Sequence, residues 1–289
     1  MTDRAAIVGA GRAGRGLARA LRASGIDVSA LVARNPLADD PDDGVTGDLG
    51  VLLRGATVVL LAVQDAALPE AVAALAAAAL ESSVVVLQLS GGTPDSVLDP
   101  VRRCGHAAGT FHPLVPLVDP ARAAESLRGA WIGVGGDARA THVAARLAGA
   151  LRARTLAVPA GSDGRAVYHA AAVIASNFPI ALAALAERLF ASTGIDTAAA
   201  RGATWHLMHT AVDNLGGRDP GEALSGPIIR GDVATAARHL DALSPDPLAL
   251  DVYVSLSALI ASVVGDRIPA NVVRELLLAL QQHARRGPT

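Results

Sequence analysis

The chain has 289 residues, 51% of them hydrophobic, and a formal net charge of −2, so it is long enough for two domains with sizeable cores. Its basic residues are scattered, its aromatic residues amount to 2%, and no unbroken apolar run has membrane-spanning length, so we expect neither nucleic acid nor membrane as partner. The single cysteine, Cys104, excludes an intramolecular disulfide framework and is typical of a cytoplasmic protein.

The N-terminal segment has the pattern of a strand, a tight turn and a helix. An apolar run over residues 5–8 leads into a GxGxxG motif, and a helical pattern follows over residues 12–23. In such motifs the first glycine permits the turn, the second lets the backbone approach a pyrophosphate, and the third lets the helix pack on the strand. The alternative is a glycine-rich turn without a ligand. The predicted cofactor contacts here are Gly9, Ala10, Gly11, Arg12, Ala13 and Gly14.

The second predicted strand, residues 27–33, is followed by Arg34, which lies 20 positions beyond Gly14 (34 − 14 = 20). NAD-binding versions of this arrangement have an acidic residue near this position, which binds the ribose 2′-hydroxyl. A guanidinium there would instead pair with a 2′-phosphate. We therefore predict NADP rather than NAD as cofactor, with a solvated surface arginine as the alternative.

Strand and helix patterns alternate through the first half of the chain, which predicts an α/β fold with a doubly wound parallel sheet. The remaining expected strands are residues 57–63, 84–89, 109–112, 131–134 and 155–158, with helices over 68–80 and 140–151. Strand patterns nearly vanish after a turn-rich segment at 159–164. Helices are expected over 165–193, 197–215, 232–243, 246–265 and 270–286. We predict a Rossmann domain over residues 1–160 and an all-α domain over residues 161–289.

Three further segments, residues 110–114, 168–178 and 225–232, complete a pattern that resembles a known family. The chain resembles the Rossmann-like NADP oxidoreductases with an uncharacterised helical C-terminal domain. This group is part of the 6-phosphogluconate-dehydrogenase-like superfamily, beside ketopantoate reductase, pyrroline-5-carboxylate reductase and prephenate dehydrogenase. The resemblance covers nearly the whole chain. It implies that Val63 and Gln64 border the nicotinamide ribose and that Ser90 and Gly91 border the nicotinamide ring.

His112 is the first candidate for catalysis. It follows a short strand, and ligands of such sheets bind outside the carboxyl ends of the strands. The His112-Pro113 pair is also similar to the His-Pro of prephenate dehydrogenases, in which the histidine bonds the substrate oxygen. A histidine there could donate a proton to a carbonyl as it becomes an alkoxide. The alternative is a histidine that hydrogen-bonds to loop backbone.

The helix expected over residues 165–193 carries further candidates. Arg165 and His169 are four residues apart and share a face. Arg165 could hold a substrate carboxylate or lie on the surface, and His169 could be the proton donor or a core residue. The chain has no lysine, so the lysine acid of some relatives cannot be carried over. Ser176 and Asn177, two turns further, could reach the other end of the substrate or the nicotinamide amide, or could bond another helix.

Two residues of the helical half complete the predicted substrate site. Asn214 lies on a helix and could line the cleft, and Arg230 is a candidate anion clamp in the 225–232 segment. His206 and His209 lack the spacing and the acidic neighbours of a metal site, so we predict no metal.

These residues predict an NADP-dependent oxidoreductase that transfers a hydride between NADPH and a small molecule with a C=O or C=N group. The superfamily resemblance suggests a 2-oxo acid such as ketopantoate first and an imino or enamine acid second, although the missing lysine counts against the first. The alternative is a sensor or scaffold protein that binds NADP without turnover.

Assembly into a homodimer is also predicted. The final expected helix, residues 270–286, has apolar residues on more than one side, which requires cover from other helices or from a second chain. Superfamily relatives commonly pair through this domain, so the resemblance implies a twofold dimer.

Overall fold

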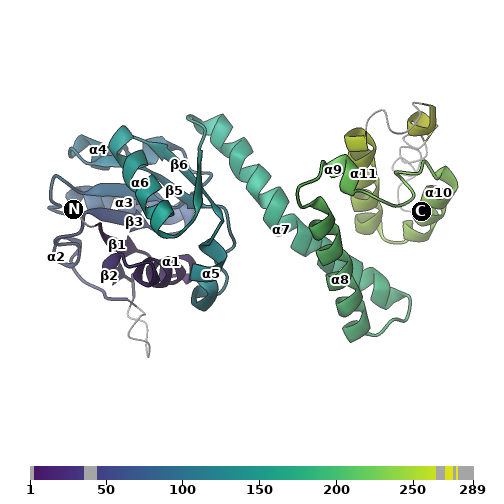
Figure 1. The fold of residues 1–289 in the computed structure, drawn as a ribbon, viewed down its shortest axis with the longest axis horizontal. Helices are drawn as coiled ribbons and strands as arrows, with labels where there is room; N and C mark the ends of the chain where they lie inside the picture. The colour runs from purple at the N-terminus through teal and green to yellow at the C-terminus, as the bar shows by residue number, and fades with distance from the viewer. Residues whose placement is uncertain (1–2, 36–43, 265–270, 276–277, 279–289) are drawn as a thin grey trace. The chain divides into compact units, whose positions relative to one another are not determined.

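The computed structural model describes residues 3–35, 44–264, 271–275 and 278. The chain divides into two compact units, residues 1–178 and residues 179–289, which we call the first and the second unit (Figure 1). The division falls within the long helix α7 (Ser162–Ser192), which begins just after the domain boundary that was predicted at residue 160. The units divide later than that boundary because the first turns of α7 pack with the first unit.

A seven-stranded sheet forms the centre of the first unit, in the order β2-β1-β3-β4-β5-β6-β7. The strands are β1 (Arg4–Val8), β2 (Asp27–Val32), β3 (Val58–Leu61), β4 (Val85–Gln88), β5 (Ala107–Pro113), β6 (Trp131–Gly136) and β7 (Arg154–Ala157). This confirms the predicted α/β class, and the expected strands coincide with the observed ones to within a few residues. Strands β1 to β5 are parallel, as predicted.

The expectation of a wholly parallel sheet is wrong for the last two strands. Strand β6 is antiparallel to β5, and β7 is parallel to β6. The cause is the connection after β5, which returns to the sheet at the edge it left, so that the Leu114 N–H donates to the Trp131 carbonyl at 2.8 Å. A parallel neighbour would have required a crossover to the opposite edge.

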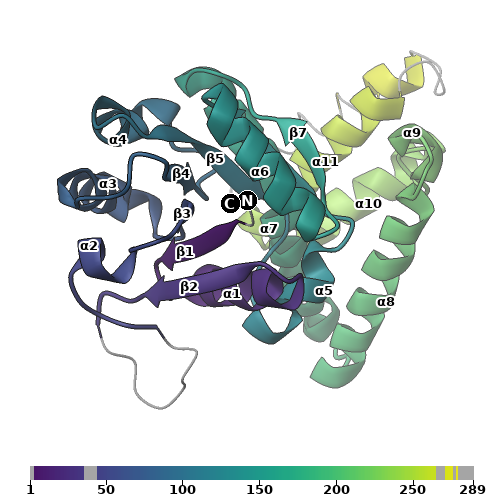
Figure 2. The same ribbon diagram turned by 60° about the vertical axis from the view of Figure 1, so that its left-hand side comes forward.

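Helices cover both faces of this sheet (Figure 2). One face packs against α1 (Arg12–Ala23), α5 (Ala123–Leu127) and α6 (Ala138–Ala150), and the other against α2 (Leu49–Leu52), α3 (Leu68–Ala77) and α4 (Asp99–Arg103). Successive strand residues alternate between the two cores, so Ile7 belongs to one and Ala6 to the other. Burial on both faces explains the continuous apolar runs of the strands. Short 3₁₀ segments are η1 (Asp65–Ala67), η2 (Asp95–Leu98) and η3 (Pro120–Arg122).

The second unit contains no strand among its described residues, as the prediction of an all-α C-terminal part requires. It comprises the end of α7 with α8 (Thr197–Leu215), α9 (Pro220–Ala223), α10 (Val233–Leu243) and α11 (Pro247–Val264). Among its described residues, one buried apolar cluster comprises Ile228, Ala236, Leu240 and Ala261. Of the helix predicted over 270–286, residues 271–275 and 278 are helical, and the others lie outside the described residues.

Helix α7 is long and apolar enough to cross a membrane, judged by length and composition alone. Ser176, Asn177 and Pro179 interrupt its apolar sequence without adding charge, which is why no unbroken apolar run of this length is present. One such helix is weak evidence of a membrane location, since helices of soluble proteins pass the same criterion. The first turns of α7 also carry Arg165 and Tyr168, which contact the sheet as described below.

Candidate active site

The glycine motif forms the close-packed turn that was predicted between β1 and α1. Gly9 has a φ of +113°, and a Cβ there would lie 2.4 Å from the Ala62 carbonyl oxygen. A Cβ on Gly14 would lie 1.8 Å from the Gly9 carbonyl oxygen. Gly9 must therefore be glycine because of both its backbone conformation and the nearby carbonyl oxygen. Gly14 must be glycine because of the nearby carbonyl oxygen alone.

Gly11 differs from these two glycines. It is the residue before the first turn of α1, its φ is −72°, and a Cβ there would meet no described atom within 4 Å. The space beside the N-terminus of α1 is thus open, and free backbone N–H groups of a helix N-terminus bind phosphate. Arg12 is exposed at this end of the helix, Ala13 is half-buried and Ala10 is buried. These residues fit the pyrophosphate of a dinucleotide.

The other predicted cofactor residues follow the neighbouring parallel strands at the same edge of the sheet. Arg34 comes two residues after β2; it is exposed, and its Nη2 lies 3.5 Å from Glu70 Oε2. Val63 and Gln64 come after β3. Ser90 and Gly91 come after β4, and the Ser90 hydroxyl donates to Thr93 Oγ1 at 2.9 Å. Parallel strands bring these segments to one edge, as the prediction supposed.

A cavity of about 730 Å³ lies within the first unit where β5 ends. Residues 112–116, from the end of β5 and the loop that follows, line one side of it. The other side is lined by α7 residues Tyr168, His169, Ala171, Ala172, Val173, Ala175, Ser176 and Asn177. The cavity therefore brings together four predicted residues: His112, His169, Ser176 and Asn177.

His112 is held in this cavity by Tyr168, for which no role was predicted. Tyr168 Oη lies 2.8 Å from His112 Nδ1, and the centroid of the His169 ring lies 6.1 Å from that of His112. Burial, with smaller contributions from neighbouring His169 and Arg165, lowers the pKa of His112 to about 4. Burial raises the pKa of Tyr168 to about 12. Both groups are therefore neutral at pH 7. The sequence signal for Tyr168 was its place beside His169.

The low pKa of His112 predicts a pH-dependent stability. The unfolded chain takes up this proton near pH 6.5 and the folded chain near pH 4, so the unfolded state binds more protons in between. The free energy of unfolding should therefore decrease as the pH falls through this window. The full difference is on the order of 3 kcal/mol, at about 1.4 kcal/mol per pH unit. Urea unfolding at several pH values checks this, and the decrease should be smaller in His112→Gln. Equal pH dependence in both proteins would contradict it.

Three glycines leave the space that the ring side chains occupy. A Cβ on Gly91 would lie 2.5 Å from His112 Cε1, and one on Gly92 would lie 2.9 Å from His169 Nδ1. A Cβ on Gly133 would lie 2.3 Å from Tyr168 Oη. None of these three glycines has a positive φ. They are therefore needed for the space that the three side chains occupy, and not for their backbone conformation.

Arg165, predicted to bind a substrate carboxylate, contacts the protein itself. Its side chain is 2% exposed, and its guanidinium donates to Thr110 Oγ1 and to the Ser90 carbonyl oxygen at 3.4 Å. Nη2 also lies 3.5 Å from Asp95 Oδ1, and Asp95 in turn pairs with Arg102. Burial lowers the pKa of Arg165. These contacts attach the first turns of α7 to β5 and to the loop after β4, and Arg165 does not line the cavity.

The remaining predicted substrate residues are in different surroundings. The Ser176 hydroxyl lies 2.7 Å from the Ala172 carbonyl oxygen and 2.8 Å from Asn177 Oδ1, at the cavity wall. Asn214, near the end of α8, and Arg230, between α9 and α10, belong to the second unit and are exposed there. Their roles stay predictions.

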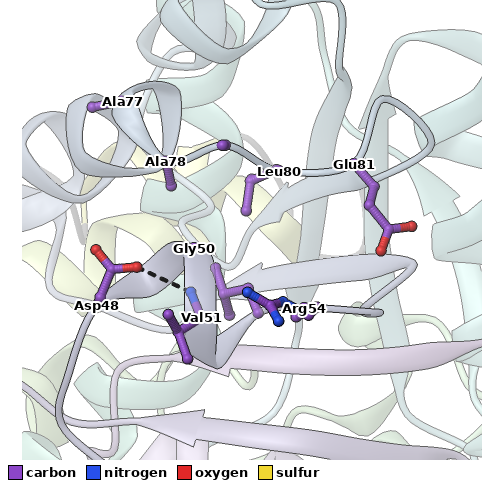
Figure 3. Close-up of a pocket in the computed structure, with 10 residues that line it drawn as sticks. Asp48, Gly50, Val51, Arg54, Ala77, Ala78, Leu80 and Glu81 are labelled. Carbon is purple, nitrogen blue, oxygen red and sulfur yellow. Dashed lines mark hydrogen bonds between the residues drawn. The ribbon is translucent and has the colours of Figure 1, made fainter.

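A second cavity of the first unit, about 550 Å³ in volume, shares no lining residue with this site. Figure 3 shows the residues that line it. Its lining includes Asp48, which accepts a hydrogen bond from the Val51 N–H at 3.0 Å, together with Arg54 and Glu81. Arg54 precedes β3 and Glu81 precedes β4, so this cavity lies at the amino edge of the parallel strands. None of the predicted site residues lines it.

Comparison with known proteins agrees with this architecture. The chain resembles protein TM1727 from Thermotoga maritima at 22% identity and a TM-score of 0.68, over 91% of this chain and 98% of the other. It resembles Plasmodium falciparum pyrroline carboxylate reductase with NADP bound at 9% identity and a TM-score of 0.61, over 99% and 98%. It resembles the Aspergillus terreus reductive aminase in complex with NADPH and ethyl-5-oxohexanoate at 16% identity and a TM-score of 0.58, over 100% of this chain and 96% of the other.

These likenesses extend to the fold, a Rossmann sheet followed by an all-α part, which is the fold that the resemblance noted from the sequence implies. Residues 130–260 match the family model described as the domain of unknown function DUF2520. No curated protein matches the sequence.

Proposed function

We propose that the protein is an NADP(H)-dependent oxidoreductase that reduces a C=O or C=N group of a small molecule. The main support is the cavity at the carboxyl end of β5, where two histidines lie beside the loop after β4 and at the same sheet edge as the glycine turn. Bound NADPH would supply the hydride, and the chain would supply orientation and a proton. Structural neighbours that contain NADP or NADPH support this assignment.

The cofactor and substrate roles follow from this arrangement. Residues 9–14 would hold the pyrophosphate and Arg34 the 2′-phosphate, with Val63, Gln64, Ser90 and Gly91 beside the nicotinamide half. In the cavity, His112 would donate the proton, His169 would hydrogen-bond to the substrate, and Ser176 and Asn177 would contact its far end. A cytoplasmic location is part of this proposal.

The proposed substrate class depends on whether the site has a cation that could bind a substrate carboxylate. Arg165 is engaged by Thr110, Ser90 and Asp95, so a 2-oxo acid such as ketopantoate, or an imino acid, would need another cation. Arg230 is the predicted candidate for that contact. A neutral ketone or imine needs only the hydrogen bonds of the two histidines.

Calorimetric titration with NADPH and NADH tests the cofactor proposal. The protein should bind NADPH more tightly than NADH. Arg34→Asp should weaken NADPH binding by about 10–100-fold, because it removes a charge-assisted hydrogen bond to the 2′-phosphate. NADH binding should change much less, since NADH lacks this phosphate.

Arg54→Asp is the matched control, because it makes the same charge change at an exposed arginine of the amino edge (Figure 3). It should leave both affinities unchanged. Equal effects of the two substitutions would reject the role of Arg34, and failure to bind either cofactor at millimolar concentration would reject the proposed function.

We also propose that two chains associate through the helical part. Large apolar side chains of α7 and α8 are exposed in the single chain: Val167 and Ile180 are both 71% exposed and Trp205 is 70% exposed. Within the second unit, a largely apolar cavity of about 570 Å³ is lined by α7 and α8 residues that include Ile180, Trp205 and Val212. Exposed apolar surface of this extent is characteristic of an interface. An obligate homodimer would bury more than about 2,000 Å² in total.

Light scattering at micromolar concentration should therefore give twice the 29.1 kDa chain mass. Trp205→Arg should shift the protein towards the monomer, because it places a charge in the apolar surface. The control is Trp131→Arg, which changes the chain's other tryptophan, 44% exposed in the first unit, and should leave the mass unchanged. A monomer mass for the unmodified protein would contradict the proposal.

A further inference from the structure

Tyr168 and His112 form a hydrogen-bonded pair in the cavity where β5 ends. Tyr168 Oη lies 2.8 Å from His112 Nδ1, and the two rings meet edge to face with their centroids 5.5 Å apart. Both side chains line the 730 Å³ cavity, so a bound molecule would contact them directly. Gly133 is paired with His112 across β5 and β6, and a side chain at Gly133 would collide with Tyr168 Oη.

The direction of this hydrogen bond follows from the chemistry of the two groups. At pH 7 the phenol keeps its proton and the imidazole is neutral. A phenolic O–H is a good donor, and the unprotonated nitrogen of imidazole is a good acceptor. The O–H of Tyr168 therefore donates to Nδ1, and the single ring proton of His112 lies on Nε2.

A neutral histidine is a poor acid by itself. Loss of the Nε2 proton would leave an imidazolate, unless Nδ1 gains a proton at the same time. Tyr168 is hydrogen-bonded to that nitrogen. Burial keeps His112 neutral at pH 7, so no imidazolium is present to act as the acid. The proton that Nδ1 gains must therefore come from a second group.

We propose that Tyr168 and His112 form a proton relay in which Tyr168 fixes the Nε2–H tautomer of His112 and supplies its Nδ1 proton. This inference rests on the proposed reductase function. As reduction leaves negative charge on the substrate oxygen or nitrogen, that atom gains the Nε2 proton of His112. The O–H bond of Tyr168 breaks, and an N–H bond forms at Nδ1.

The relay then resets without net change to the protein. The Nδ1 proton returns to the phenolate of Tyr168, and Nε2 takes up a proton from solvent, so one solvent proton is consumed in each turnover. The charge of the nearby Arg165 stabilises the phenolate while it lasts, which is the direction in which Arg165 acts on the pKa of Tyr168. Arg165 is thus a positioning residue that also provides favourable charge.

Long-range ¹H–¹⁵N NMR of the histidine rings tests the tautomer without cofactor or substrate. His112 signals are assigned by their loss in His112→Gln. In the unmodified protein Nδ1 should be unprotonated and Nε2 protonated. Tyr168→Phe keeps the ring but removes the donor, so the Nδ1–H form should become populated. Gly133→Ala, whose Cβ displaces Tyr168 Oη, should have the same effect and serves as a second variant.

Turnover provides the second readout. Tyr168→Phe should lower turnover by about 10²–10³-fold, a typical contribution of a proton-transfer group, while NADPH affinity stays within about twofold. The matched control is Tyr253→Phe, because Tyr253 Oη lies 2.8 Å from His239 Nδ1 in the second unit. That variant removes the same kind of bond and should leave both the His112 tautomer and turnover unchanged.

A ring proton on Nδ1 of His112 in the unmodified protein would overturn the relay. So would unchanged turnover in a folded Tyr168→Phe protein. If the unmodified protein binds no NADPH, the proposed function fails on its own, and the tautomer measurement still decides whether Tyr168 fixes the state of His112.

Discussion

Replacing His112 with glutamine is expected to lower turnover by about 10²–10⁴-fold, the range for loss of a general acid. Glutamine can still accept the hydrogen bond of Tyr168, so the local structure should survive, but an amide cannot pass a proton on. The melting temperature at pH 7 and the affinity for NADPH should therefore change little. Steady-state kinetics, thermal unfolding and cofactor titration of the same preparation measure the three quantities.

His169→Ala distinguishes the two histidines of the cavity. If His169 only hydrogen-bonds to the substrate, its loss should lower kcat/KM by about tenfold, equivalent to about 1.4 kcal/mol. The melting temperature should fall only slightly, because among the described residues His169 packs on Gly92 and His112 and makes no hydrogen bond. The opposite ranking, with His169→Ala nearly inactive and His112→Gln active, would make His169 the proton donor.

Gly14→Ala is expected to disrupt both the stability of the first unit and cofactor binding. The new Cβ would lie 1.8 Å from the Gly9 carbonyl oxygen and 3.3 Å from Ala62 Cβ, so α1 must move away from β1. Overpacking of this kind costs about 1–3 kcal/mol or more. Because the same movement opens the phosphate turn, NADPH affinity should fall by at least about 100-fold, or about 2.7 kcal/mol. Urea unfolding and calorimetry check the two effects.

Gly11→Ala separates the two effects, since a Cβ at Gly11 meets no described atom and its φ of −72° suits alanine. Its free energy of unfolding should equal or exceed that of the unmodified protein, because alanine reduces the freedom of the unfolded chain. NADPH binding should nevertheless weaken, since the methyl group occupies the space of the pyrophosphate. Unchanged NADPH affinity would place the phosphates elsewhere.

The features of the fold that could be predicted are those encoded in adjacent residues. The glycine spacing from Gly9 to Gly14 and the apolar runs of the strands are local patterns, although the turn also packs on Ala62 and donates a hydrogen bond to the Val32 carbonyl. The direction of β6 could not be predicted in this way, because an apolar strand has the same pattern whichever way it runs. It depends on where the connection after Pro113 rejoins the sheet.

The site residues show the same limit. The spacing of Arg165 and His169 correctly placed them on one helix, but the environment of Arg165 is created by Thr110 and Asp95, which are 55 and 70 positions away. A helical pattern carries no information about such partners. Tyr168 was overlooked for the same reason, since its significance comes from His112 and Gly133, two residues on neighbouring strands.

The reversed direction of β6 and β7 determines the polarity with which α7 approaches the site. Since β7 runs opposite to β5, the chain leaves the sheet on the side away from the carboxyl edge, and α7 must travel back along β5. It meets Thr110 first, through Arg165, then His112, through Tyr168, and its later turns line the cavity. A helix that arrived from the carboxyl edge would place its first turn beside the substrate. Here the α7 residues beside the cavity lie within the helix, so helical turns precede and follow them.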